Sequence, residues 1–138
     1  MNRAELQHLS RARKQEASLL LRQGHGLGGY YLMGYAVECA LKACIAKQTK
    51  RHDFPDKGLA NHAHTHDLPN LAKLAGLGTA LETELAKSKS FAVNWAIVKD
   101  WSESARYDLT ITPRRAREFY SACAARKSGV LTWIRSKW

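Results

Sequence analysis

Residues 30–47 read YYLMGYAVECALKACIAK, and this stretch decides the fold. Its apolar side chains fall on nearly every side of a helix rather than along one stripe, which is typical of a helix at the centre of a bundle. Glu38 is the only acidic residue in the stretch. Because a carboxylate among apolar neighbours carries a large desolvation cost, Glu38 needs a partner, and Lys42 follows at the favourable i, i+4 spacing for an ion pair.

An amphipathic helix is predicted before this central one, ending near Gly24. The run 24–29, GHGLGG, then holds four glycines, whose backbone entropy disfavours a helix interior, so a break is expected. We interpret it as a tight turn in which small residues allow close approach. The alternative is a phosphate loop, but this run has neither the preceding strand nor the Lys-Ser/Thr pair that such loops carry. The apolar stripe of the first helix comprises Leu6, Leu9, Ala17, Leu20 and Leu21.

Two short helices are predicted after a long loop at 48–66, where turn formers, charges and histidines are mixed. Asp67 is a suitable N-cap and Pro69 is tolerated in a first turn, so one short helix begins there. A second short helical stretch is expected around Leu81 and Leu85. In the first of these helices Leu68, Leu71, Leu74 and Leu77 are expected to face the core.

Two longer helices complete the predicted bundle. Trp95, Val98 and Trp101 repeat on one helical face, and this helix is expected to stop close to Arg106. Thr112 and Pro113 together form a good helix start, and the last helix is predicted to continue from there to residue 134.

The predicted fold class is all-α. The longest β-like run, residues 109–112, is too short to seed a sheet. The 138 residues suffice for one domain of ordinary size. A single domain over residues 1–138 is therefore expected, an up-and-down bundle of four or five helices.

The charge balance favours an anionic partner. The chain has 22 Lys and Arg against 12 Asp and Glu, a net charge of +10. Residues 1–51 and 91–138 carry nine basic groups each, whereas residues 52–90 carry four. A basic run on the last predicted helix either follows a nucleic-acid backbone or forms a solvated face, and sequence leaves both open. Its members are Arg114, Arg115, Arg117, Arg126, Lys127, Arg135 and Lys137.

Membrane and secreted classes do not fit the sequence. No stretch approaches the ~20 apolar residues that span a bilayer, and the first residues lack the apolar region of a signal peptide. We therefore expect a cytoplasmic protein without membrane contact. Cys39, Cys44 and Cys123 are odd in number and lack CxxC spacing, which favours reduced, buried thiols.

Three histidines alternate in the predicted loop, at His62, His64 and His66. In an extended chain they would project to one side and could ligate zinc or nickel. Because no cysteine lies nearby in sequence, a solvated loop is the favoured interpretation, and no metal or cofactor is expected. His66 also sits at a helix start, where its imidazole either acts as an acid or base or only supports the helix.

Arg106 follows the tryptophan-rich helix and precedes Tyr107, so its guanidinium should emerge at the edge of the core. The planar guanidinium fork suits a phosphate group. A structural salt bridge, for instance to Glu38 across the bundle, is an equal alternative.

The order of these features resembles the HEPN domain, the higher eukaryotes and prokaryotes nucleotide-binding domain. Four pieces carry the resemblance: ASLLL (17–21), YYLMGYAVECALKA (30–43), THDL (65–68) and ARY (105–107). Together they span almost the whole chain, and the A-x-E-x-A-L-K-A helix at 36–43 is the strongest piece. The resemblance implies a small up-and-down helical bundle, commonly a homodimer, that binds nucleotide or RNA.

The resemblance also bears on catalysis. RNases of this family pair an arginine with a histidine four to six residues later, across a dimer, to activate a ribose 2′-OH without metal. Many belong to toxin–antitoxin and defence systems, and other members accompany a small nucleotidyltransferase. Arg106 matches the family arginine, but residues 107–112 contain no histidine. This departure weakens the case for cleavage and leaves the case for binding intact.

Three hypotheses follow. The first is a binding module whose cleft is formed by Glu38, Lys42, His66, Arg106 and Tyr107, the positions that the resemblance assigns to the polar cleft. The second is a metal-independent RNase in which His66 replaces the missing histidine as the catalytic partner of Arg106. The third is a structural or partner-binding bundle that has no nucleic-acid ligand.

Overall fold

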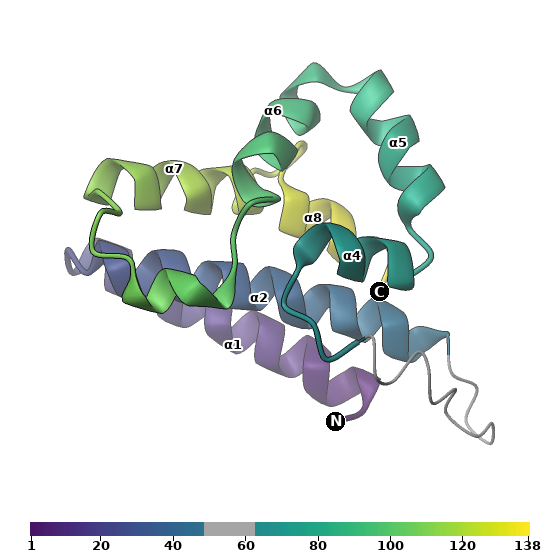
Figure 1. Ribbon diagram of the computed structural model, residues 1–138, viewed down its shortest axis with the longest axis horizontal. Coiled ribbons are helices and arrows are strands. Elements are labelled where there is room, and N and C mark those ends of the chain that lie inside the picture. Colours follow the sequence, from purple (N-terminus) through teal and green to yellow (C-terminus); the bar gives the residue numbers. More distant parts are fainter. Residues whose placement is uncertain (49–62) are drawn as a thin grey trace.

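The computed structural model describes residues 1–48 and 63–138 of the chain. Within these residues the protein is all-helical and has no strand (Figure 1). The predicted all-α bundle is confirmed, although the second half is divided into more helices than expected. The elements are α1 (Arg3–Arg22), α2 (Gly26–Lys47), α4 (Leu68–Leu74), α5 (Gly78–Lys87), α6 (Lys89–Val98), the 3-10 helix η1 (Glu103–Tyr107), α7 (Pro113–Ala124) and α8 (Val130–Arg135).

Helices α1 and α2 form an antiparallel hairpin along one side of the molecule (Figure 1). A capping box starts α1: the Glu5 amide donates to Asn2 Oδ1 at 2.9 Å, and the Asn2 amide donates to Glu5 Oε2 at 2.8 Å. Between the helices, the buried Ser10 hydroxyl donates to the Ala36 carbonyl at 2.7 Å. This bond satisfies a polar group that would otherwise be costly to bury.

The turn between α1 and α2 is shorter than the predicted break over residues 24–29. Only residues 23–25 interrupt the helices, and Gly24 alone in this run has a positive φ, +83°. The expected break over the rest of the run is wrong, because α2 begins at Gly26. Close packing explains the glycines there: a Cβ on Gly29 would lie 2.7 Å from the Leu21 side chain. The interpretation as a tight interhelix turn with close approach is confirmed.

Helix α2 is the centre of the fold, as its apolar sequence predicts. Helices α1, α4, α7, α8 and η1 all pack against it, and most of its side chains from Tyr30 to Ile45 are buried. On its α7 side the ring centroids of Tyr30 and Phe119 lie 4.4 Å apart. A helix covered on all sides needs no polar stripe, which explains why this segment shows almost no amphipathic pattern.

The last predicted helix is in fact two helices, α7 and α8, separated by residues 125–129. The expected start is confirmed, since Thr112 Oγ1 accepts from the Arg115 amide at 3.1 Å. The break occurs at Gly129, where a Cβ would lie 2.5 Å from the Ala125 carbonyl oxygen. Because apolar residues resume after the break, the stripe alone did not reveal it. The basic run therefore lies on two helices and their connection rather than on one continuous face.

The three cysteines are buried and free, as predicted. Burial raises the pKa of Cys39 to about 11 and that of Cys44 to about 11, and it also raises the pKa of Cys123. These thiols therefore remain protonated near neutral pH and are poor nucleophiles.

Candidate functional site

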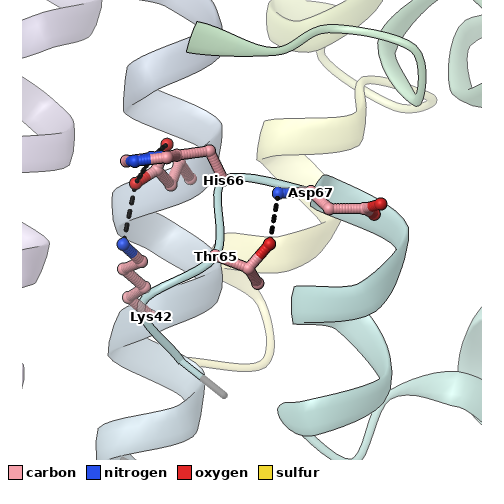
Figure 2. Close-up of polar contacts among 5 residues, drawn as sticks. Lys42, Thr65, His66 and Asp67 are labelled. Carbon is pink, nitrogen blue, oxygen red and sulfur yellow. Dashed lines mark hydrogen bonds and ion pairs between the residues drawn. The ribbon is translucent and has the colours of Figure 1, made fainter. Parts of the chain in front are cut away.

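A buried carboxylate with a lysine and a histidine as partners lies at the centre of the candidate site. Glu38, on α2, is 1% exposed. Its Oε1 accepts from Lys42 Nζ at 2.8 Å, and His66 Nδ1 lies 2.9 Å from Oε1 and 3.0 Å from Oε2 (Figure 2). The predicted Glu38–Lys42 pair is confirmed. The alternative ion pair between Glu38 and Arg106 is not present among the described residues.

The start of α4 positions His66. Asp67 caps this helix, its Oδ1 accepting from the Asn70 amide at 3.0 Å, and Pro69 occupies the first turn, as predicted. The Asp67 amide in turn donates to Thr65 Oγ1 at 3.1 Å (Figure 2). These two bonds fix the backbone on both sides of His66. The histidine is thereby directed from the helix start toward α2.

The contact with Glu38 determines which ring nitrogen of His66 is available. An ionised carboxylate can only accept hydrogen bonds, so Nδ1 must carry the proton that it donates to Glu38. Nε2 has no hydrogen-bond partner within residues 1–48 and 63–138. With the ring about one third exposed, Nε2 can accept a proton from a ligand or donate one to it.

A cleft of about 640 Å³ opens beside His66. One wall is the start of α4, and the other is the segment 99–103 between α6 and η1. Besides His66, its charged lining residues are three carboxylates and one lysine: Asp67, Asp100, Glu103 and Lys99. The cleft therefore favours ligand groups that donate hydrogen bonds, such as hydroxyl and amino groups, and opposes a bare phosphate.

Trp101 holds this second wall against α2. Its side chain is 2% exposed, and a Cβ on Gly34 would lie 2.1 Å from the indole ring. The Tyr31 ring stacks with that of Trp101, with ring centroids 6.2 Å apart. The predicted helix through Trp101 is wrong, because α6 ends at Val98 and Trp101 lies in the loop before η1. The packing of the Trp101 indole against Gly34 therefore determines the position of Trp101, although its sequence spacing from Trp95 and Val98 is helical.

Arg106 lies on η1 and is exposed, with its Cζ 4.9 Å from the centroid of the Tyr107 ring. Interaction with the phenol of Tyr107, and secondarily with that of Tyr31, raises the pKa of the Arg106 guanidinium. The Tyr107 side chain is 75% exposed. Arg106 and Tyr107 therefore present a permanent cation and an open aromatic face to solvent.

The two candidate catalytic residues do not meet within one chain. Arg106 lies beside Tyr31, and His66 contacts Glu38. Tyr31 and Glu38 are seven residues apart on α2, on the same helix face and about 10 Å along the axis. Neither a hydrogen bond nor an ion pair joins Arg106 to His66 among the described residues. One protomer thus offers a basic, aromatic end and a histidine end on one side of α2.

The structure describes two of the three alternating histidines. His62 lies outside the described residues, His64 is exposed, and His66 is bonded to Glu38. In the described part of the chain no three His, Cys, Asp or Glu side chains are grouped so that they could hold a metal ion.

Sequence reasoning missed the residues of segment 99–103. Asp100, Ser102 and Glu103 line the cleft, yet the helical spacing of the tryptophans drew attention away from them. The signal that could have found them is the polar composition of Lys-Asp-Trp-Ser-Glu, which is typical of a loop.

None of the described helices is both long enough and apolar enough to cross a membrane. Comparison of the chain with protein-family models, with curated proteins and with solved structures gives no match.

Proposed function

We propose that the protein is a HEPN-like module that binds RNA or a nucleotide. The observation that carries the proposal is the cluster of Glu38, Lys42 and His66 at the edge of a cleft. These are polar positions that the resemblance assigns to a binding cleft, and they come from α2 and from the segment before α4.

The chemistry of the two ends suggests how such a ligand lies. At one end, Arg106 offers a fork for a phosphate and Tyr107 an exposed ring on which a base can stack. At the other end, the carboxylates of the cleft accept hydrogen bonds from ribose hydroxyls or base amino groups. RNA has both kinds of group, and a nucleotide has them on a single residue. The acidic lining favours a phosphate at Arg106 over one beside His66.

The biological setting in this proposal is a cytoplasmic homodimer that works in a toxin–antitoxin system or with a small nucleotidyltransferase. A second chain fits this proposal because Arg106 lies beside Tyr31 and His66 contacts Glu38, two different turns of α2. In a dimer that brings the two ends together across the interface, both would face the same ligand. A nucleotidyltransferase gene beside this one would support the pairing.

The test is direct binding of a nucleoside triphosphate and of a labelled oligouridylate at about 50 mM salt. We expect Arg106→Gln to weaken binding at least about tenfold, the usual scale for losing a bidentate charged contact. Arg126→Gln, an exposed arginine of the α7–α8 connection, is the matched control and should change affinity less than about threefold. Failure of the wild type to bind either ligand would reject the proposal in favour of a structural bundle.

A ribonuclease is the second candidate, and one observation favours it. Glu38 fixes His66 through Nδ1, and Nε2 has no hydrogen-bond partner among the described residues, the arrangement by which a carboxylate orients a catalytic histidine. In this scheme Nε2 takes the proton of a ribose 2′-OH while that oxygen bonds to the adjacent phosphorus. The bond from phosphorus to the 5′-oxygen breaks, the 5′-oxygen takes a proton from water, and Arg106 of a partner subunit stabilises the charge on the phosphate. No metal is required.

Cleavage of unstructured RNA in the presence of a chelator tests this candidate. His66→Ala and Arg106→Ala should each abolish cleavage. Mixing the two inactive variants should restore part of the activity, because some mixed dimers hold one intact composite site. No cleavage by the wild type across a range of RNAs, or no rescue on mixing, would contradict the composite site.

A further inference from the structure

A second cleft lies between α1, α7 and α8. Its volume is about 330 Å³. Its charged lining residues are all cations: Arg11, Lys14, Arg22 and Arg135. It shares no lining residue with the cleft beside His66. We call it the basic cleft.

The basic cleft carries four positive charges and no lining carboxylate. None of the four cations forms an ion pair within residues 1–48 and 63–138. The nearby acid on α1, Glu16, is paired with Arg13 at 3.2 Å. A concave site with one sign of charge concentrates its field and attracts counter-ions of the other sign. The cleft beside His66 differs in charge, since its lining includes three carboxylates.

Two of the cations are brought together by a shared aromatic ring. Arg11 of α1 and Arg135 of α8 both lie over the indole of Trp138, with Cζ 4.9 Å and 5.3 Å from its centroid. Two like charges beside one ring repel each other, and an anion bound near both relieves that repulsion. The contacts with Trp138 also restrain the two guanidiniums, both of which belong to lining residues of the cleft.

Neutral donors complete the lining. Ser18 and Tyr120 are half-buried and supply hydroxyl groups, and Gln15 supplies an amide. Guanidinium forks and hydroxyl donors together match the oxygens of a phosphate group. The volume is at the lower end of small-ligand sites, enough for a phosphate with its sugar but not for a folded partner. A flat membrane surface would not enter a concavity of this kind.

We infer that the basic cleft is a docking site for the phosphate backbone of an RNA strand, separate from the Arg106 and His66 ends. This inference rests on the proposed function and specifies its ligand further: the ligand is a polynucleotide, since a mononucleotide at Arg106 would leave the basic cleft empty. Recognition there is independent of base sequence, because the lining offers charges and hydroxyls to the backbone. The cleft positions the strand, and the other site contacts its reactive or specific portion.

The experiment compares two charge-matched double variants of the full chain. Arg11→Gln with Arg135→Gln removes two charges from the basic cleft. Arg126→Gln with Lys127→Gln removes two exposed charges from the α7–α8 connection, outside the lining of every cleft described. Binding of a labelled oligouridylate of about 16 nucleotides is followed by fluorescence anisotropy from about 50 to 200 mM salt. Thermal unfolding confirms that each variant is folded.

The cleft variant should bind at least about tenfold more weakly than the wild type. Its plot of log affinity against log salt should be shallower by about 1.4, because each phosphate contact contributes about 0.7 to the slope on a single strand. The control should lose less than about threefold. Nucleoside triphosphate binding should be unchanged in both variants.

Should the Trp138 contacts prove necessary for folding, Lys14→Gln with Arg22→Gln removes the same charge without touching that ring. Equal weakening by the cleft and control variants, with the wild type binding well, would overturn the docking site while leaving the proposed function intact. Absence of all wild-type binding would overturn both. Displacement of the oligonucleotide by polyglutamate at equal charge would also overturn the assignment to phosphate.

Discussion

The imidazole of His66 and the carboxylate of Glu38 form a pair, with Nδ1 2.9 Å and 3.0 Å from the two carboxylate oxygens, although 28 residues separate them in the chain. This pair fastens the segment before α4 to the central helix. It also places a titratable ring, fixed through one nitrogen, at the edge of the cleft. Both the stability of this region and its proposed chemistry therefore depend on one contact.

Removing His66 should destabilise the fold, because it leaves the buried Glu38 carboxylate with Lys42 as its remaining partner. We expect His66→Ala to lower the free energy of unfolding by about 1–3 kcal/mol. A double-mutant cycle with Glu38→Ala should give a coupling of about 0.5–3 kcal/mol in urea denaturation. His64→Ala, at an exposed neighbour, is the control and should stay within about 0.5 kcal/mol. Additive effects of the two substitutions would contradict a direct contact.

A methyl group on Gly34 should disrupt the wall of the cleft. Gly34→Ala places a Cβ where indole atoms of Trp101 lie, so Trp101 must move, at an overpacking cost of about 1–3 kcal/mol or more. The matched substitution Gly78→Ala, at a helical glycine with open space around its Cβ position, should be neutral or slightly stabilising. Thermal unfolding of the two variants tests this. Equal melting temperatures would show that Trp101 is not held as described.

Stability should fall at alkaline pH because of the buried thiols. Burial raises the pKa of Cys39 from its ordinary value of 9.0 to about 11 in the folded protein, so the folded state binds this proton more tightly. The stabilisation is complete below pH 9 and is lost as pH rises through 11. Relative to Cys39→Ala, wild-type protein should lose about 2 kcal/mol of unfolding free energy between pH 8 and 11. Urea denaturation in the presence of a reductant measures the difference, and a constant difference would argue against the raised pKa.

The proposed composite site requires a dimer. Sedimentation at micromolar concentration should therefore give a particle of twice the mass of one chain, and dilution should weaken ligand binding as the dimer dissociates. A monomer that binds RNA at full affinity would exclude a site shared between two copies.

Several parts of the fold were predictable because their cause is local. The Asp67 cap with Pro69 in the first turn depends on neighbouring residues only, and it is confirmed. The need of Glu38 for a cationic partner followed from its apolar surroundings, and Lys42 was within one helical turn. His66 as a second partner could not be inferred from residue types, since nothing in a 28-residue separation fixes which loop side chain returns to α2.

The errors arose where tertiary packing overrides a pattern. Trp101 continued the spacing of a helix, but its ring packs on the bare backbone of Gly34, and the chain leaves the helix to reach it. Gly29 was expected in a break and instead lies in the first turn of α2. A glycine is needed at this position because the Leu21 side chain occupies the space that a Cβ would fill. The basic cleft is a product of three helices meeting, and no single stretch of sequence carries it.

The short turn at residues 23–25 has a consequence for how the protein folds. It joins the two longest helices with almost no loop to close, so their contacts are local in sequence and form with little entropic penalty. We expect the α1–α2 hairpin to assemble early, with Glu38 already on its surface, and η1 and the start of α4 to dock later. The two walls of the cleft, at His66 and Trp101, would then be the last to reach their positions and the first to open during local unfolding.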